Sequence, residues 1–124
     1  MIQIVMNNLV PKGAQKPFDI FGDIHFEIDG YCFPSEDWDD FVSPILYWWQ
    51  ARLSEMIENE KDTCELLFMD GNCSVIVHDQ GETVDMDFIM RDRIERTITG
   101  INKAELCSVV NEALESLDIP HLKQ

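Results

Sequence analysis

Basic residues are scarce in this sequence. Its 124 residues include 9 Lys and Arg against 24 Asp and Glu, which gives a formal net charge of −15. Residues 18–51 carry eight acids and residues 62–90 carry seven, and neither stretch contains Lys or Arg, so local ion pairs cannot neutralise them. Such a chain repels phosphate backbones and anionic lipid surfaces and attracts basic proteins. The charge therefore argues against a nucleic-acid or membrane partner, although solubility alone would also explain it.

Long apolar runs, a basic leader and paired cysteines are also missing. No run approaches the roughly 18 to 20 residues of a membrane span, and residues 1–6 lack the basic segment that opens a signal peptide. The four cysteines form no Cys-x-x-Cys pair and lie among apolar residues: Cys32, Cys64, Cys73 and Cys107. Zinc and redox motifs are therefore not indicated, and we expect free thiols in a cytoplasmic protein.

No repeat and no Pro/Gly/Ser-rich linker divides the chain. The length is typical of one domain, and 45% of the residues are hydrophobic, which is enough to build a core. We therefore expect residues 1–124 to form a single domain.

Two strands are predicted near the N-terminus. An apolar segment, residues 2–6, is followed by a loop-like stretch over residues 7–17. Residues 20–29 then alternate between apolar and polar types, which is typical of a strand with one wet face. The side chains expected on the core side are Ile24, Phe26 and Ile28, and those expected in water are Asp23, His25, Glu27 and Asp29.

A helix is predicted after the second strand. Ser35 is a plausible N-cap, and Ser43-Pro44 would restart the helix behind a second cap. Apolar residues then recur at helical spacing to about Glu58. In this stretch Trp49 falls in the buried stripe, whereas Tyr47 and Trp48 lie beside it, where one of them is a candidate anchor in an interface.

Two short turns predict a three-stranded antiparallel meander. Asp70-Gly71 separates residues 64–69 from 72–78, and Gln80-Gly81 separates the latter from residues 82–89. With two-residue loops, the numbers of cross-strand partners sum to 141 in the first hairpin and to 161 in the second. This register makes one face entirely apolar and gives the other face nearly every polar side chain, together with Leu67 and Ile76. A one-residue slip would expose the apolar set.

Three arginines and a capped helix follow the meander. Arg91, Arg93 and Arg96 form the one basic cluster, and we expect them to balance neighbouring acids. Asn102 and Glu105 form a capping box for a last helix, which Pro120 closes. The order of elements predicts an α+β fold: an antiparallel sheet with a three-stranded C-terminal meander and two main helices packed on one face.

The polar face of residues 20–29 contains residue types that serve catalysis and metal binding. Alternate side chains on a strand lie about 6 to 7 Å apart, however, and no second motif completes a ligand shell. No nucleophile elbow or phosphate-binding loop occurs, and His78 is expected to be an ordinary surface histidine. We therefore expect no enzyme activity, no cofactor and no metal site; the minor alternative is a hydrolase or metal-dependent enzyme that uses Asp23, His25 and Glu27.

The middle of the chain contains a pattern of aromatic residues and a turn. It reads Phe33-Pro34-x-x-Asp37-Trp38-x-Asp40-Phe41, then Leu46-x-Trp48-Trp49, then Phe68-Met69-Asp70-Gly71. Over roughly residues 24–90 this pattern resembles that of small bacterial immunity proteins, which accompany polymorphic toxins, including those of contact-dependent growth inhibition. The resemblance implies a cytoplasmic antidote without catalytic residues. Such a protein binds a cognate toxin domain, often a basic nuclease, and blocks its active site or its access to substrate.

The resemblance identifies no contact residues, so the candidates come from the strand pattern. Six carboxylates are expected to project outward from strands and to meet a basic toxin domain: Asp23, Glu27, Asp29, Glu65, Asp85 and Asp87. The alternative function is an acidic cytosolic adaptor or regulatory subunit without a toxin partner.

Overall fold

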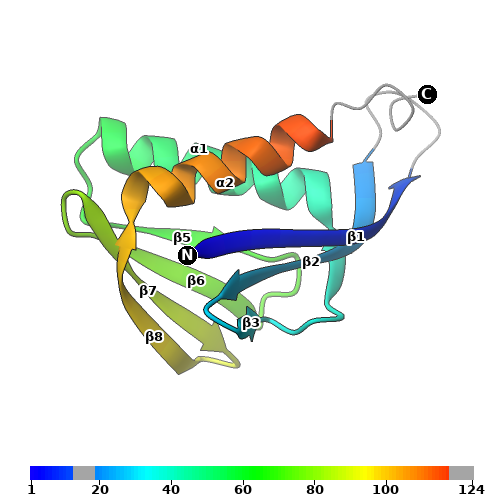
Figure 1. Cartoon of the computed structure of the whole chain (residues 1–124), viewed down its shortest axis with the longest axis horizontal. Coiled ribbons are helices and arrows are strands. Elements are labelled where there is room, and N and C mark those ends of the chain that lie inside the picture. Colours follow the sequence, from blue (N-terminus) through cyan, green and yellow to red (C-terminus); the bar gives the residue numbers. More distant parts are fainter. Residues whose placement is uncertain (13–18, 118–124) are drawn as a thin grey trace.

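The computed structural model describes residues 1–12 and 19–117, which form two antiparallel sheets and two helices (Figure 1). In the first sheet β2 pairs with the other three strands: β1 (Ile2–Lys12), β2 (Asp19–Ile28), β3 (Tyr31–Phe33) and β4 (Asp39–Phe41). The second sheet has its strands in sequence order: β5 (Thr63–Leu67), β6 (Cys73–Asp79), β7 (Thr83–Met90) and β8 (Arg93–Asn102). The helices are α1 (Val42–Glu58) and α2 (Lys103–Ser116). The predicted α+β class is confirmed.

Both helices lie on the same side of the two sheets (Figure 1). Helix α1 packs on β2 and β5, whereas α2 packs on α1, β1, β7 and β8, so each helix contacts both sheets. The buried side chains form one core, and aromatic rings join its layers. Phe26 of β2 stacks on Trp49 of α1 with ring centroids 4.8 Å apart. The centroid of the Phe26 ring also lies 6.3 Å from that of Phe88 of β7.

Strand β1 is longer than the sequence pattern predicts. It continues through the first part of the expected loop and ends at Lys12, whereas residues 13–17 of that loop lie outside the described residues. A register shift between Asn7 and Val10 interrupts its pairing with β2, and Asn8 there has a φ of 55°. A Cβ on the facing Gly22 would lie 2.9 Å from the Asn7 and Asn8 carbonyl oxygens, so this close approach requires glycine.

The prediction that a helix begins near Ser35 is wrong. Residues 34–38 form a loop, residues 39–41 form β4, and α1 begins at Val42. The two expected capping hydroxyls have other partners: Ser35 Oγ donates to Asp37 Oδ1 at 2.9 Å, and Ser43 Oγ accepts from Ile20 N at 2.8 Å. Pairing of β4 with β2 therefore replaces the first predicted helical turns. The helix ends at Glu58, as expected.

The first hairpin of the meander has the predicted register, but the second is shifted by two residues. Leu66 pairs with Val75, which confirms the sum of 141. Val75 then pairs with Phe88, so these partners sum to 163 rather than 161. The turn is centred on Gly81 and Glu82, and Gly81 has the positive φ, 101°, that the first central position of a type II′ turn requires. An even shift leaves every side chain on its predicted face.

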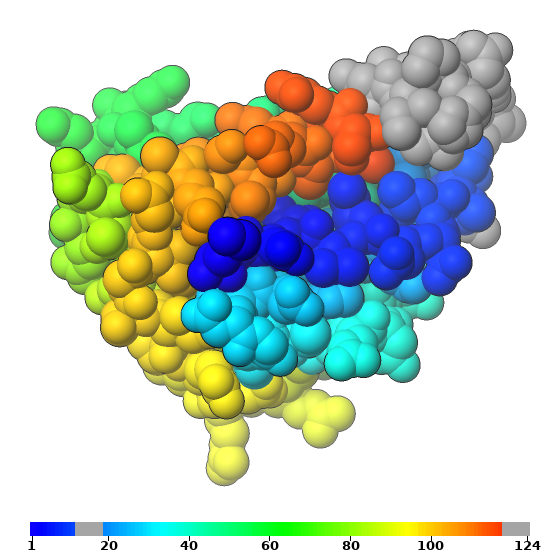
Figure 2. Space-filling model, viewed as in Figure 1, coloured from blue at the N-terminus to red at the C-terminus, as the bar shows by residue number. Residues whose placement is uncertain are grey.

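A fourth strand, β8, extends the meander that was expected to have three. Arg91 and Asp92 form the turn into it, with φ values of 54° and 65°. Most residues of β8 are exposed on this sheet edge, so its sequence lacks a clear apolar alternation. Figure 2 shows the yellow segment that contains the β7–β8 turn projecting from the lower edge of the molecule.

The arginines around this turn do not balance neighbouring acids as predicted. Within the described part of the chain, none of Arg91, Arg93 and Arg96 has a carboxylate oxygen within 4.0 Å. The Arg96 guanidinium instead lies 4.5 Å from the centroid of the Tyr31 ring. Burial, followed by a hydrogen bond donated to Glu95, raises the pKa of Tyr31.

The predicted cap of the last helix is confirmed. Asn102 Oδ1 accepts a hydrogen bond from Glu105 N at 2.8 Å. Pro120, expected to close the helix, lies outside the described residues. Neither helix is both long enough and apolar enough to cross a membrane, within the ranges that the structure covers.

Candidate partner-binding surface

The second sheet has a core-facing side and an outer face. Leu66, Val75, Val77, Met86 and Phe88 point into the core and are fully buried. The outer face consists of three rows that follow from the strand register: Leu67, Ser74, Ile89 and Ile94 in the first; Glu65, Ile76, Asp87 and Thr97 in the second; Thr63, His78 and Asp85 in the third. These rows contain no Lys or Arg, and Ser74 is their one buried member.

Two of the six predicted carboxylates are held in place on this outer face. Asp87 accepts a hydrogen bond from Thr97 Oγ1 at 2.6 Å, and its other oxygen lies 2.8 Å from His78 Nε2. The hydrogen bond from Thr97, followed by that from His78, lowers the pKa of Asp87, so it remains ionised. Asp85 accepts from Gly100 N at 3.0 Å and from Gln80 Nε2 at 3.2 Å. Both carboxylates are thus oriented by the sheet.

Glu65 completes the acidic part of the face. It is exposed, and its side chain forms no hydrogen bond or ion pair with any other described residue. Ile76 lies between Glu65 and Asp87 in the second row. The structure therefore brings Glu65, Asp85 and Asp87 together on one rigid surface.

The other three predicted carboxylates lie on the first sheet. Asp23 accepts a hydrogen bond from Asn8 Nδ2 at 2.8 Å, and Glu27 is half-buried. Asp29 is not on the strand, because β2 ends at Ile28; it lies in the following turn with a φ of 49°, 3.3 Å from the amino group of Met1. The six candidates therefore form two separate groups, because the sheets turn their inner faces to a common core.

The alternation predicted that His25 lies on the wet face of the strand. This prediction is wrong, because the His25 side chain is only 5% exposed. The loop of residues 34–38 runs beside it, since Trp38 O accepts a hydrogen bond from the adjacent Ile24 N at 2.9 Å. Its Nδ1 atom has no hydrogen-bond partner among the described residues. Within that same part of the chain, no group of three His, Cys, Asp or Glu is arranged to hold a metal ion.

The acid excess is largely unpaired. Among the side chains that the structure describes, only two carboxylates form ion pairs with Lys or Arg: Glu55 with Lys61 and Arg52, and Asp79 with Lys103. The other described carboxylates form no ion pair, apart from Asp29 with the amino terminus and Asp87 with His78. Every described carboxylate except the buried Asp40 is half-buried or exposed, so most of the negative charge counted in the sequence lies at the surface.

The aliphatic side chains of the outer face were not among the predicted site residues. Leu67 and Ile76 were placed on this face by the hairpin register, but they were not recognised as part of a site. The register shift moved Ile89 opposite Ser74, and Ile94 lies on the strand that the sequence pattern did not reveal. A row of apolar residues on the polar side of a predicted sheet is the signal that could have identified them.

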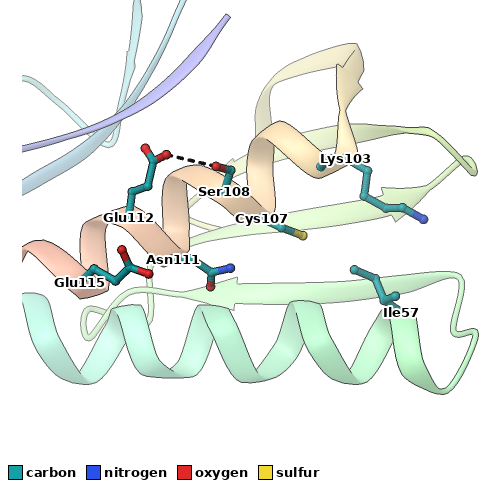
Figure 3. Close-up of a pocket in the computed structure, with 8 residues that line it drawn as sticks. Ile57, Lys103, Cys107, Ser108, Asn111, Glu112 and Glu115 are labelled. Carbon is teal, nitrogen blue, oxygen red and sulfur yellow. Dashed lines mark hydrogen bonds between the residues drawn. The ribbon is translucent and has the colours of Figure 1, made fainter.

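A shallow groove of about 620 Å³ lies between the two helices. Figure 3 shows Ile57 of α1 on one side of it and Lys103, Cys107 and Asn111 of α2 on the other. Burial raises the pKa of the Cys107 thiol, and Lys103 donates to Asp79 at 3.1 Å. These side chains therefore offer no activated nucleophile.

Replacing Asp87 with asparagine tests whether this carboxylate is structural. Because its pKa is lowered in the folded state, its contribution to stability is present above the unfolded pKa of about 3.9 and is lost as the pH falls through the lowered value. We expect Asp87→Asn to reduce the free energy of unfolding by about 1 to 2 kcal/mol at pH 7 and by much less at a pH below the lowered pKa of Asp87. Urea unfolding at both pH values measures this. Glu65→Gln, on the same face, should change little at either pH, and an Asp87→Asn effect independent of pH would contradict the assignment.

Most residues of the pattern that resembles immunity proteins have structural roles. Phe33, Trp49 and Phe68 are buried, whereas Trp48 is 40% exposed, and Asp70 accepts a hydrogen bond from Asn72 N at 2.9 Å in the turn. Comparisons of the chain with family models, with curated proteins and with solved structures found no match. The resemblance to immunity proteins therefore stays an expectation that rests on these positions.

Proposed function

We propose that this protein is a cytoplasmic immunity protein that binds and neutralises a basic toxin domain through the outer face of its second sheet. The observation that carries the proposal is the unpaired negative charge. The chain has a net charge of −15, and only Glu55 and Asp79 of the described carboxylates pair with Lys or Arg. The resemblance of the aromatic pattern to immunity proteins supports the same function.

The acidic face is suited to fast association. A field of one sign steers an oppositely charged partner toward the surface and accelerates encounter, most strongly at low ionic strength. Asp85 and Asp87 are already held by backbone and side-chain donors, so binding orders them little further. Glu65, free of such bonds, is available for direct contact. A toxin held on this face has its basic, substrate-binding surface covered.

Identification of the partner tests the function directly. The tagged protein, expressed in its native cells, is captured at low ionic strength, and bound proteins are identified by mass spectrometry. We expect a basic domain that arrests bacterial growth when expressed alone and no longer does so when this protein is co-expressed. Capture of a biosynthetic or regulatory assembly, with no growth-arresting component, would instead support an adaptor.

Two matched triple variants test which acidic group is used. One neutralises the second sheet (Glu65→Gln, Asp85→Asn and Asp87→Asn), and the other neutralises the first sheet and its turn (Asp23→Asn, Glu27→Gln and Asp29→Asn). Each removes three negative charges, so general effects of net charge cancel in the comparison. We expect the first variant to slow association with the captured toxin domain about tenfold at low salt and to flatten its salt dependence, and the second to change it about twofold or less. Stopped-flow measurement of the association rate gives both values, and the reverse order would place the interface on the first sheet.

A further inference from the structure

The outer face of the second sheet exposes an apolar row beside its acids. Leu67 and Ile94 are 40% and 60% exposed, and Ile89 lies between their strands, half-buried. Ile76 of the second row extends the apolar area toward Glu65 and Asp87. In this row the buried Ser74 lies between Leu67 and Ile89. Exposed aliphatic side chains gathered on one face of a sheet are characteristic of a surface that another chain covers.

We propose that this face docks a basic amphipathic helix of the partner, whose aliphatic ridge lies along the row Leu67–Ile89–Ile94 and whose Lys and Arg side chains reach Glu65, Asp85 and Asp87. This deepens the proposed function and rests on it. The second and third rows contain three carboxylates, Glu65, Asp85 and Asp87, and no Lys or Arg, so they complement a cationic flank. A helix with an acidic flank would instead be repelled by these carboxylates.

The dimensions of the face fit a single helix. Strands lie about 4.8 Å apart, so a row that crosses four of them is roughly 14 Å long, the length of about ten helical residues. Successive rows are about 7 Å apart along the strands, within reach of a Lys or Arg side chain from a helix that lies on the first row. The apolar row would then contribute to the lifetime of the complex, whereas the carboxylates accelerate its formation.

Other occupants fit this part of the molecule less well. Addition of a strand at the β8 edge is opposed by two register shifts in the β7–β8 pairing, because bulges twist a sheet edge away from a straight partner strand. A second copy of the chain would bring two acidic faces and two net charges of −15 together. A cationic helix meets neither obstacle.

A model peptide tests the proposal without knowledge of the natural partner. The probe is a helical peptide of about 20 residues made of Leu and Lys, with Leu along one side, and its control is a scrambled peptide of the same composition. Each is titrated into the isotope-labelled full chain while backbone amide NMR signals are recorded. We expect the amphipathic peptide to shift the amides of β5 to β8 around Leu67, Ile76, Ile89 and Ile94, and the scrambled peptide to bind about tenfold more weakly.

Variants separate the apolar contribution from the charge. The double variant Leu67→Thr and Ile94→Thr keeps all charges. It should weaken binding of the amphipathic peptide about tenfold, because several methyl and methylene groups would no longer be buried in the complex. Val10→Thr is the matched control, since Val10 is 44% exposed on a strand of the other sheet. The amide spectrum of each variant verifies its fold. Shifts centred on another surface, equal binding of the scrambled peptide, or equal loss in the Val10 control would each overturn the proposal.

The result is distinguishable from failure of the proposed function. If a toxin partner is captured but the peptide does not select this face, the helix-docking proposal is wrong and the immunity function stands. If the peptide binds as expected but no growth-arresting partner exists, the docking surface is supported and the immunity function is wrong.

Discussion

Replacing Trp49 with alanine is expected to lower the free energy of unfolding by about 3 to 5 kcal/mol. Trp49 is fully buried, stacks on Phe26, and its ring centroid lies 5.2 Å from that of Phe68. Its indole N–H also donates to the Leu67 carbonyl oxygen at 2.7 Å, so the substitution leaves both a cavity and an unpaired acceptor. Because these contacts join α1 to both sheets, the whole core is affected. Urea unfolding followed by circular dichroism measures the change.

The neighbouring tryptophan is the control for this prediction. Trp48 is 40% exposed on the same helix, and Trp48→Ala should cost less than about 1 kcal/mol. The pair also separates the two roles considered for these aromatic residues, core packing for Trp49 and interface contact for Trp48. Equal destabilisation by the two substitutions would mean that the described core is incorrect.

Removal of the Asp40 carboxylate is expected to destabilise the fold by about 3 kcal/mol. Asp40 is 4% exposed, and one of its oxygens accepts from Phe41 N at 2.8 Å. The other accepts from Trp38 Nε1 at 3.1 Å and from Met69 N at 3.2 Å. Asp40→Ala leaves all three donors without an acceptor in a partly buried site. The contact with Met69 also ties β4 to the hairpin turn of the second sheet, so its loss loosens the connection between the sheets.

A graded series makes this prediction specific. Asp40→Asn keeps one acceptor oxygen and should fall between the wild type and Asp40→Ala. The adjacent Asp39 is exposed, so Asp39→Ala should change stability by less than about 0.5 kcal/mol while removing the same charge. Thermal and urea unfolding of the four proteins gives the order. An Asp39→Ala effect as large as that of Asp40→Ala would show that charge, rather than hydrogen bonding, is responsible.

Local patterns predicted the central parts of the fold correctly. The alternation of residues 20–29 located β2 and its buried face, because Ile24, Phe26 and Ile28 can be shielded from water only on one side of a strand. The turn at Asp70-Gly71 set the register of the first hairpin, and Asn102 with Glu105 located the start of α2. Each of these features depends on residues within a few positions of one another.

Features that depend on distant partners were not predicted. The serines expected to cap a helix form other hydrogen bonds, one of them to Ile20, which the sequence gives no means of anticipating. His25 alternates with the apolar residues as a surface side chain would, yet it is buried in the folded chain. Strand β8 is recognisable only through its pairing with β7, because most of its side chains are exposed.

The candidate surface likewise depends partly on local sequence and partly on the tertiary structure. The sequence by itself determined the sign and the excess of charge, since composition and the absence of Lys and Arg over long stretches do not depend on folding. It also determined which side chains alternate together, since strand periodicity is local. The turns predicted from the sequence also placed Glu65, Asp85 and Asp87 on one face with Leu67. Only the tertiary structure decided that Ile94 of β8 joins this face and that Ile89 lies opposite Ser74, while Asp23, Glu27 and Asp29 lie elsewhere. The physical reason is that strand register and the packing of two sheets on one core place residues that are far apart in the chain side by side, and no local pattern encodes these pairings.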